Sequence, residues 1–270
     1  MGSRPNHFYG TVLKTKRSAI LSVLALALVL VLPASLSAAQ RPRTEDAAVT
    51  PVYASWHQKD NDRIMADLKK HNGDVGLLLI GDSITALWPT KGPKSYSVFL
   101  PWKPLNVAIS AEHTEHVLYR LLNGNIEGIK PKAAMILIGT NNLGHEPHEK
   151  PEWAAAGVRK VVDTVRAKSP GTKILLLALF PRGAEKKGPD GIFKNTKPTD
   201  SIRQRTVETN KLIAQIADNK MVFFMDIGSL YVDAEGNIRT DLMPDNLHPN
   251  EAGYQLWLNA VKPRLDELMK

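Results

Sequence analysis

The sequence predicts a three-layer α/β/α sandwich built on a parallel, doubly wound sheet. Short apolar runs alternate with helical patterns along most of the 270 residues, and several of these runs are apolar on both faces. Strands buried on both faces are typical of parallel sheets with helices above and below. The composition, 43% hydrophobic and 23% charged, is that of a globular protein and excludes a disordered or fibrous chain.

Each predicted element has its own pattern. The strands are short apolar runs without charge, at 75–80, 133–138, 174–179 and 221–225, and residues 106–109 are a candidate for a shorter strand. Apolar residues at helical spacing predict helices at about 60–70, 112–122, 152–168 and 201–219. A last helix follows Asn250, which is a suitable N-cap, and carries Tyr254, Trp257 and Leu258 on one face.

The first 39 residues have the three-part pattern of a secretory signal peptide. Four basic residues precede an apolar run at 19–32, which Pro33 ends, and Ser37 and Ala39 are the small side chains required before a cut at Gln40. The run is short for a membrane-spanning helix, so an uncleaved anchor is the less favoured alternative. We therefore expect a secreted or periplasmic protein without stable membrane insertion after cleavage.

The remainder is predicted to be a polar linker at 40–51 and one α/β domain at 52–270. The formal net charge is +8, but four of the basic residues lie among the first 39, where no acidic residue occurs, so half of the charge belongs to that segment. What remains is too small to indicate a nucleic-acid partner. The chain has no cysteine, which excludes disulfides, thiolate metal sites, a cysteine nucleophile and a lipid-anchored cysteine.

Polar residues follow the apolar runs, where a doubly wound sheet places its active site. Ser83 follows the first run in GDSI, at a helix start whose free amides favour an oxyanion, and Asn141 follows a later run in GTNN. Asp245 and His248 are three residues apart, a spacing that lets the acid hold the imidazole toward a nucleophile. Each of these residues taken alone has a simpler structural explanation. Ser83 could be a helix N-cap, Asn141 could belong to a turn, and Asp245 could be a capping residue beside a surface histidine.

Together these blocks resemble the GDSL, or SGNH-hydrolase, superfamily. The stretches LNVAISAEHTEHVLYRL (105–121), IKPKAAMILIGTNN (129–142) and LMPDNLHPNEAGY (242–254) are similar to the catalytic subunits of platelet-activating-factor acetylhydrolase and to bacterial GDSL-type acetylesterases. The resemblance covers roughly residues 75–263, which is nearly all of the expected mature chain. It implies the flavodoxin-like fold of the SGNH hydrolases.

The resemblance also assigns roles to five residues. It implies that Ser83 is the nucleophile, His248 the general base and Asp245 the residue that orients it. The oxyanion hole would consist of the Ser83 and Ala111 amides and the Asn141 side chain. Ala111 is a departure, because the family usually has glycine there. The donor is a backbone amide, so alanine can supply it at negative φ, whereas a positive φ would cost about 1 kcal/mol or more.

Two HxxH pairs raise the question of a metal. His113 and His116 form the first pair, and His145 and His148 the second. Pro147 interrupts the second pair, and neither has the glutamate of an HExxH motif. We therefore expect no metal and no organic cofactor.

Three residues are candidates for substrate contact, namely His145, Trp88 and Arg182. Helix packing explains Trp88 equally well. Residues 181–200, which are rich in Gly, Pro and Lys, are either a lid over the site or a solvated surface loop.

The expected activity is that of a serine esterase acting on short-chain esters, most simply acetyl esters, of a small molecule or a glycan. A lysophospholipase or phospholipid acylhydrolase is an alternative, and so is a non-catalytic carbohydrate-binding relative that retains the pocket. Because all four side chains needed for the chemistry are present, a working enzyme is the favoured interpretation.

Overall fold

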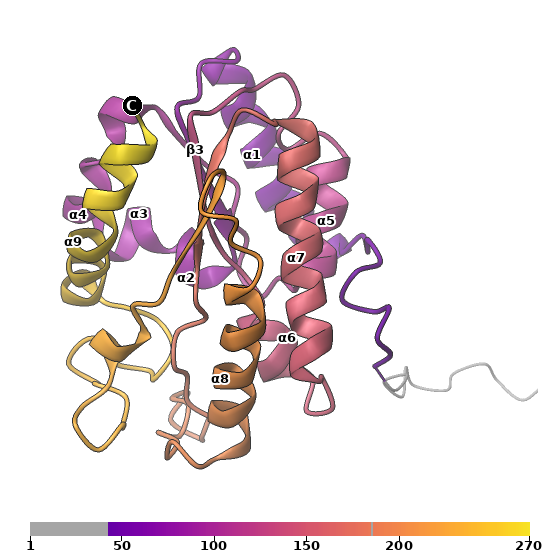
Figure 1. The fold of residues 1–270 in the computed structure, drawn as a ribbon. Coiled ribbons are helices and arrows are strands. Elements are labelled where there is room, and N and C mark those ends of the chain that lie inside the picture. The colour runs from indigo at the N-terminus through magenta and orange to yellow at the C-terminus, as the bar shows by residue number, and fades with distance from the viewer. Residues whose placement is uncertain (1–42, 185) are drawn as a thin grey trace, which may run out of the picture. The chain divides into compact units, whose positions relative to one another are not determined.

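The structure is a computed structural model that describes residues 43–184 and 186–270 (Figure 1). The predicted signal peptide lies outside these residues. In the part described, five strands form one sheet in the order β2-β1-β3-β4-β5, and every neighbouring pair is parallel. The strands are β1 (Leu77–Gly81), β2 (Pro104–Asn106), β3 (Ala133–Leu137), β4 (Lys173–Leu177) and β5 (Val222–Met225). This confirms the predicted doubly wound sheet.

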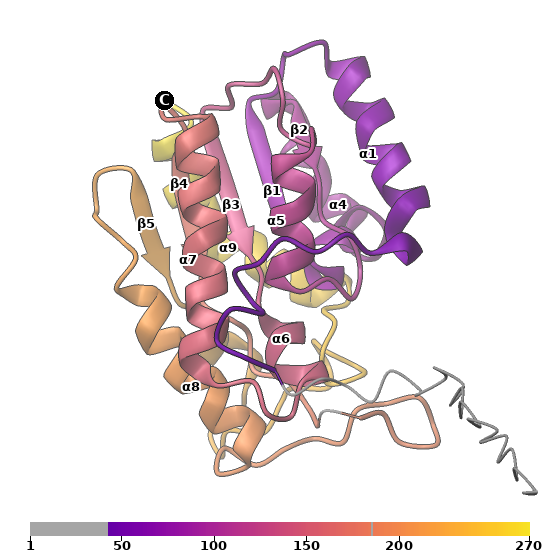
Figure 2. The same cartoon turned by 90° about the vertical axis from the view of Figure 1, so that its right-hand side faces the viewer.

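Helices cover both faces of the sheet. Helices α5, α7 and α8 pack together on one face, and α3, α4 and α9 on the other (Figures 1 and 2). The helices are α1 (Gln58–His71), α2 (Ser83–Ala86), α3 (Trp88–Lys91), α4 (Pro93–Ser97), α5 (Thr114–Leu122), α6 (Thr140–His145), α7 (Pro151–Lys168), α8 (Ser201–Ala214) and α9 (Glu251–Leu268). The three layers are therefore those that the sequence predicts.

The apolar runs of the sequence form the centre of the hydrophobic core. Every residue of β1 and β3 is buried, as expected of strands with helices on both sides. Asn250 caps α9 as predicted, because its side-chain oxygen accepts a 3.0 Å hydrogen bond from the Gly253 amide. Tyr254 and Trp257 on α9 then face the core and are fully buried.

The two largest differences from the predicted boundaries have local reasons. Strand β2 ends at Asn106, earlier than expected, because the Asn106 side chain accepts from the Ala108 amide at 3.0 Å and donates to the Thr85 carbonyl at 3.0 Å, which turns the chain away. Helix α8 ends at Ala214, where 219 was expected. The Asp218 carboxylate accepts hydrogen bonds from the amides of residues 220–222 and forms the turn into β5.

Part of the segment predicted to be a linker is packed on the domain. Ala48 is fully buried, and its carbonyl accepts a 2.8 Å hydrogen bond from the Thr114 hydroxyl. Arg43 forms ion pairs of 2.6 Å with Glu115 and 2.7 Å with Glu149. No helix between residues 43 and 184 or between 186 and 270 has the length and apolar character needed to cross a bilayer.

Candidate active site

Ser83 stands at the tight turn between β1 and α2. It is the first residue of α2, so its amide has no acceptor within the helix. Asp82 is the N-cap, and its carboxylate accepts from the Ile84 amide at 3.0 Å. Gly81 is required by space, because a Cβ there would lie 2.6 Å from the Leu137 carbonyl oxygen. The serine hydroxyl is thus held at the carboxyl edge of the sheet.

Ser83, His248 and Asp245 form one hydrogen-bonded relay. The Ser83 Oγ lies 2.8 Å from Nε2 of His248, and Nδ1 of the same ring lies 2.6 Å from an Asp245 carboxylate oxygen. The other carboxylate oxygen accepts the His248 amide at 2.7 Å. Burial alone would raise the pKa of Asp245, but the hydrogen bonds from His248 lower it to about 2. Asp245 is therefore ionised at neutral pH and holds the histidine by its side chain and its backbone.

The turn that carries Asp245 and His248 is held by the loop after β4. Asn246 has a left-handed backbone with φ of 60°, a conformation that Asn tolerates better than most residues. Its side chain donates to the Phe193 carbonyl at 2.5 Å, and its own carbonyl accepts the Gly183 amide at 2.8 Å. Gly183 and Phe193 of the loop after β4 therefore brace the turn that carries Asp245 and His248.

Of the other two predicted oxyanion residues, Ala111 lies in the loop after β2 and Asn141 at the start of the helix after β3. Asn141 is the second residue of α6, which follows β3, and its side-chain amide donates to the Glu112 carbonyl at 3.1 Å. This bond joins the loop after β3 to the loop that contains Ala111. Ala111 has a φ of 62°, so the loop does require the left-handed conformation that favours glycine. Gly139 before Asn141 also has a positive φ, of 120°.

A buried polar cluster lies behind the Ala111 loop. The Glu112 carboxylate accepts from His57 Nδ1 at 2.7 Å and from Arg120 Nε at 2.7 Å, and all three residues are nearly inaccessible to solvent. The Arg120 guanidinium also donates to the Asn125 side chain. The sequence analysis missed this cluster, because its members are polar, His57 lies 55 residues before Glu112, and no short motif joins them.

Two of the candidate substrate contacts are wrong. Trp88 is fully buried, stacks on Trp257 at 4.3 Å and donates its indole N–H to Ser95, so helix packing is the correct interpretation. Arg182 is buried too; it donates to the Thr140 carbonyl at 3.0 Å and braces α6 against the loop after β4. His145, in contrast, is exposed at the end of α6.

The four paired histidines lie on or beside the same two loops. Nε2 of His113 lies 3.1 Å from Nδ1 of His145, and Nδ1 of His116 accepts from the His113 amide. Desolvation in the packed loops and, second to it, the neighbouring His113 together lower the pKa of His116 and of the partly exposed His145 to about 4. Among the described residues, no group of three or more His, Asp or Glu side chains could hold a metal ion.

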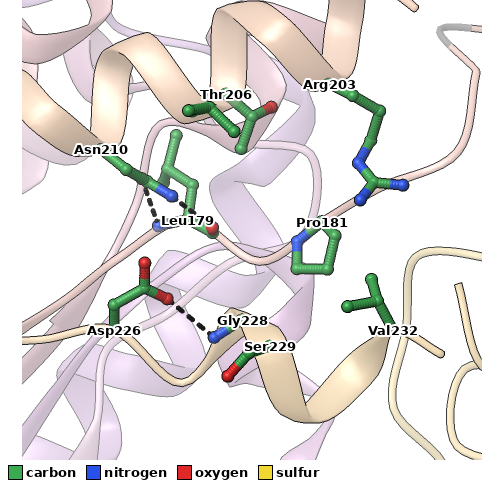
Figure 3. Close-up of a pocket in the computed structure, with 10 residues that line it drawn as sticks. Leu179, Pro181, Arg203, Thr206, Asn210, Asp226, Gly228, Ser229 and Val232 are labelled. Atoms are coloured by element: carbon green, nitrogen blue, oxygen red, sulfur yellow. Dashed lines mark hydrogen bonds between the residues drawn. The ribbon is translucent and has the colours of Figure 1, made fainter. Parts of the chain in front are cut away.

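Two cavities lie at this edge of the sheet. One of about 230 Å³ is lined by Asp245 and His248 together with Leu87, Lys91, Pro244, Pro249 and Asn250. The other, of about 180 Å³, lies between α8 and the loops after β4 and β5 (Figure 3). Two of its polar side chains are already paired: Asn210 bonds both the amide and the carbonyl of Leu179, and Asp226 accepts from the Gly228 amide. Only the first cavity touches the relay.

Comparison with known proteins agrees with this arrangement. Residues 79–256 match the model of the GDSL-like lipase/acylhydrolase family. The chain is 33% identical over 204 residues to the rat platelet-activating factor acetylhydrolase IB subunit alpha2, a match that covers 74% of this chain and 78% of the relative. The human subunit alpha1 is 29% identical, with 77% and 81% covered. The fold and the family match define an ester hydrolase, and the chain belongs to the GDSL-like lipase/acylhydrolase family.

Solved structures show the same fold at low sequence identity. A GDSL-like lipase from Bacteroides thetaiotaomicron superposes with a TM-score of 0.59 at 17% identity, covering 78% of this chain and 96% of that one. Est24, a carbohydrate acetylesterase from Sinorhizobium meliloti, gives 0.54 at 17% identity, covering 72% and 99%. These neighbours confirm the predicted fold, and the family match confirms the predicted superfamily.

Proposed function

We propose that the chain is a serine esterase that hydrolyses short-chain esters, above all acetyl esters, through Ser83, His248 and Asp245. The observation that supports this is the relay of 2.8 Å and 2.6 Å hydrogen bonds at the carboxyl edge of the sheet. The acetylhydrolase names of relatives that are about one third identical favour an acetyl group. No metal or organic cofactor is needed for this chemistry.

The reaction follows from the positions of these groups. The Ser83 oxygen attacks the ester carbonyl as His248 takes its proton, and Asp245 stabilises the imidazolium. The oxyanion accepts hydrogen bonds from the Ser83 and Ala111 amides and from the second N–H of the Asn141 side chain. His248 then protonates the leaving alcohol, and water attacks the acyl-serine by the same route. The products are a carboxylic acid and a free alcohol.

Replacement of the nucleophile tests this proposal. We expect Ser83→Ala to lower p-nitrophenyl acetate turnover to near background with folding intact, and Ser97→Ala, an exposed serine on α4, to keep full activity. A phosphonate probe should label Ser83. Labelling of another serine with Ser83 unmodified would contradict the assignment.

Exhaustive EDTA treatment should leave turnover unchanged, and recovery of lost activity by Zn²⁺ would contradict the metal-free mechanism.

A phospholipid ester is the second candidate substrate. Lys91 lines the 230 Å³ cavity that also contains His248, and its ammonium group would suit the phosphate of a lysophospholipid. Release of acetate from acetylated oligosaccharides, compared with release of fatty acid from lysophospholipids, decides between the two substrate classes. A chain that binds saccharides but releases neither acid would be the non-catalytic relative.

We also propose that residues 1–39 are a cleaved export signal, so that the esterase works in the periplasm or outside the cell. The order of a basic segment, an apolar run and small residues supports this. Sequencing of the mature N-terminus tests it, and we expect the chain to begin at Gln40.

A further inference from the structure

Two buried carboxylates lie behind the candidate oxyanion loops and take no part in the proposed reaction. Glu115 is in the first turn of α5 and Glu149 precedes α7, and both side chains are nearly inaccessible to solvent. Both accept hydrogen bonds from the side-chain amide of Asn142, at 3.1 Å and 3.5 Å. Carboxylates that are removed from water in this way need charged or hydrogen-bonding partners, because their desolvation is costly.

Arg43 supplies a positive charge to both carboxylates. Its Nη1 lies 2.6 Å from Glu115, and its Nε and Nη2 lie 2.7 Å and 3.3 Å from the two Glu149 carboxylate oxygens. The arginine side chain is itself only 12% exposed. Burial alone would raise the pKa of the Glu115 carboxyl, but hydrogen bonds from His113 and Arg43 lower it below its usual range. The guanidinium therefore joins two carboxylates that would otherwise repel each other.

Asn142 connects these carboxylates to the candidate oxyanion hole. It follows Asn141 directly on α6 and is fully buried. Its side-chain oxygen accepts a 3.0 Å hydrogen bond from the Thr114 amide at the start of α5, three residues after Ala111. The Asn142 side chain thus ties α6 to the end of the loop that carries Ala111, and the two carboxylates hold that side chain in turn.

The segment at 43–52 is packed against α5 and α7. The Val52 amide donates to the Glu115 carbonyl at 3.0 Å. A Cβ at Gly157 of α7 would lie 2.8 Å from the Ala48 carbonyl oxygen, so the close approach of this segment requires a glycine on the helix. Figure 2 shows the segment, in indigo, crossing α5 and α7 before the chain enters α1. The backbone around Arg43 is therefore fixed independently of the arginine side chain.

We propose that Arg43 is a positioning residue for the candidate oxyanion hole. It holds the two carboxylates, which hold Asn142, and Asn142 keeps the neighbouring Asn141 aimed at the oxyanion. This inference rests on the proposed esterase function and adds a residue to it. The family match begins at residue 79 and does not include Arg43.

A double-mutant cycle on p-nitrophenyl acetate turnover tests this role. We expect Arg43→Ala to lower kcat about tenfold with little change in KM, because a misplaced donor loses part of the 10²- to 10³-fold that its removal costs. In an Asn141→Ala background the same change should lower kcat by at most about twofold, because no donor remains to be misplaced. Equal falls in kcat in the two backgrounds would show a merely structural role and overturn the proposal.

Two further variants complete the cycle. Arg264→Ala is the matched control, because this arginine forms a surface ion pair with Glu267 on α9, on the other face of the sheet, and it should keep full kcat. If Arg43→Ala does not fold, Arg43→Lys takes its place, since lysine keeps the charge but lacks the fork that bridges both carboxylates. We expect Arg43→Lys to lower kcat about threefold alone and not at all in the Asn141→Ala background.

Hydrogen exchange separates this proposal from the esterase function. We expect the amides of residues 111–114 and 140–145 to exchange about tenfold faster in the Arg43 variant than in the wild type, whereas those of β4 stay protected. Faster exchange at these residues without ester hydrolysis by the wild type would contradict the esterase function and leave the positioning role standing. Hydrolysis by the wild type, with kcat and exchange both unchanged in the Arg43 variant, would overturn the positioning role alone.

Discussion

The side-chain amide of Asn141 donates a 3.1 Å hydrogen bond to the backbone carbonyl of Glu112. One N–H of the amide is thereby fixed, and the other is the one that the proposed mechanism directs at the oxyanion. The same bond ties the loop after β3 to the loop that carries Ala111, so the amide donors of both loops are held together before a substrate arrives. Preorganised donors of this kind are what stabilise an oxyanion most effectively.

Removal of the Asn141 amide should therefore affect the transition state more than the bound substrate. We expect Asn141→Ala to lower kcat on p-nitrophenyl acetate by about 10²- to 10³-fold with little change in KM. Asn123→Ala at the end of α5 is the control, because that exposed side chain bonds only the Tyr119 carbonyl. A raised KM with an unchanged kcat would show that Asn141 contacts the ground state instead.

The buried Glu112 carboxylate should contribute strongly to stability. Glu112→Gln would leave the Arg120 guanidinium buried without its counter-charge, and we expect a loss of about 3 kcal/mol in the free energy of unfolding. Glu127→Gln is the matched control, because its ion pair with Lys168 is at the surface and should contribute less than about 1 kcal/mol. Urea unfolding of both variants measures the difference, and equal losses would contradict the role of the cluster.

The sequence predicted the sheet and the relay for one physical reason. Runs that are apolar on both faces identify buried parallel strands, and the carboxyl ends of such strands meet at one edge. Ser83 and Asn141 both follow such runs, so their proximity could be expected before any coordinates. Asp245 and His248 are three residues apart, so a single turn of the chain is enough to bring the carboxylate to the imidazole ring.

The sequence could not predict which polar residues are buried. Glu112, Arg120 and His57 have the composition of a solvated surface, and only the three-dimensional packing brings them into one cluster. Trp88 shows the opposite case, since a residue close to the nucleophile in sequence turns into the core and stacks on α9. The sequence alone does not show whether side chains such as those of Glu112 and Trp88 point into the core or toward solvent.

Asp82 provides a prediction about pH. Burial raises the pKa of its carboxyl to about 6, against 3.8 in a model peptide. Between these values the folded state binds the proton more tightly than the unfolded state, so the contribution of Asp82 to stability falls as pH rises from 4 to 6. We expect Asp82→Asn, which keeps the N-cap, to gain stability over the wild type across this range, by up to about 3 kcal/mol above pH 6.

Thermal or urea unfolding at several pH values measures the Asp82 effect. The quantity to follow is the difference in unfolding free energy between Asp82→Asn and the wild type, because other groups cancel in it. Asp163→Asn on the exposed side of α7 serves as the control variant. A difference that stays flat from pH 4 to pH 7 would contradict the raised pKa.

Ala111 gives the last prediction, because its φ of 62° places a Cβ in the left-handed region. This conformation costs a non-glycine residue about 1 to 2 kcal/mol, and glycine loses about 0.5 to 1 kcal/mol more entropy on folding than alanine. We therefore expect Ala111→Gly to raise the free energy of unfolding by about 0.5 kcal/mol and kcat to stay level or rise modestly. The variant should be measured on acetyl and butyryl esters together. A change in the ratio of kcat on the two esters would show that the Ala111 methyl group shapes the acyl pocket, whereas an equal change in kcat on both would indicate an effect on oxyanion geometry. A many-fold fall in kcat with the fold intact would contradict the expectation.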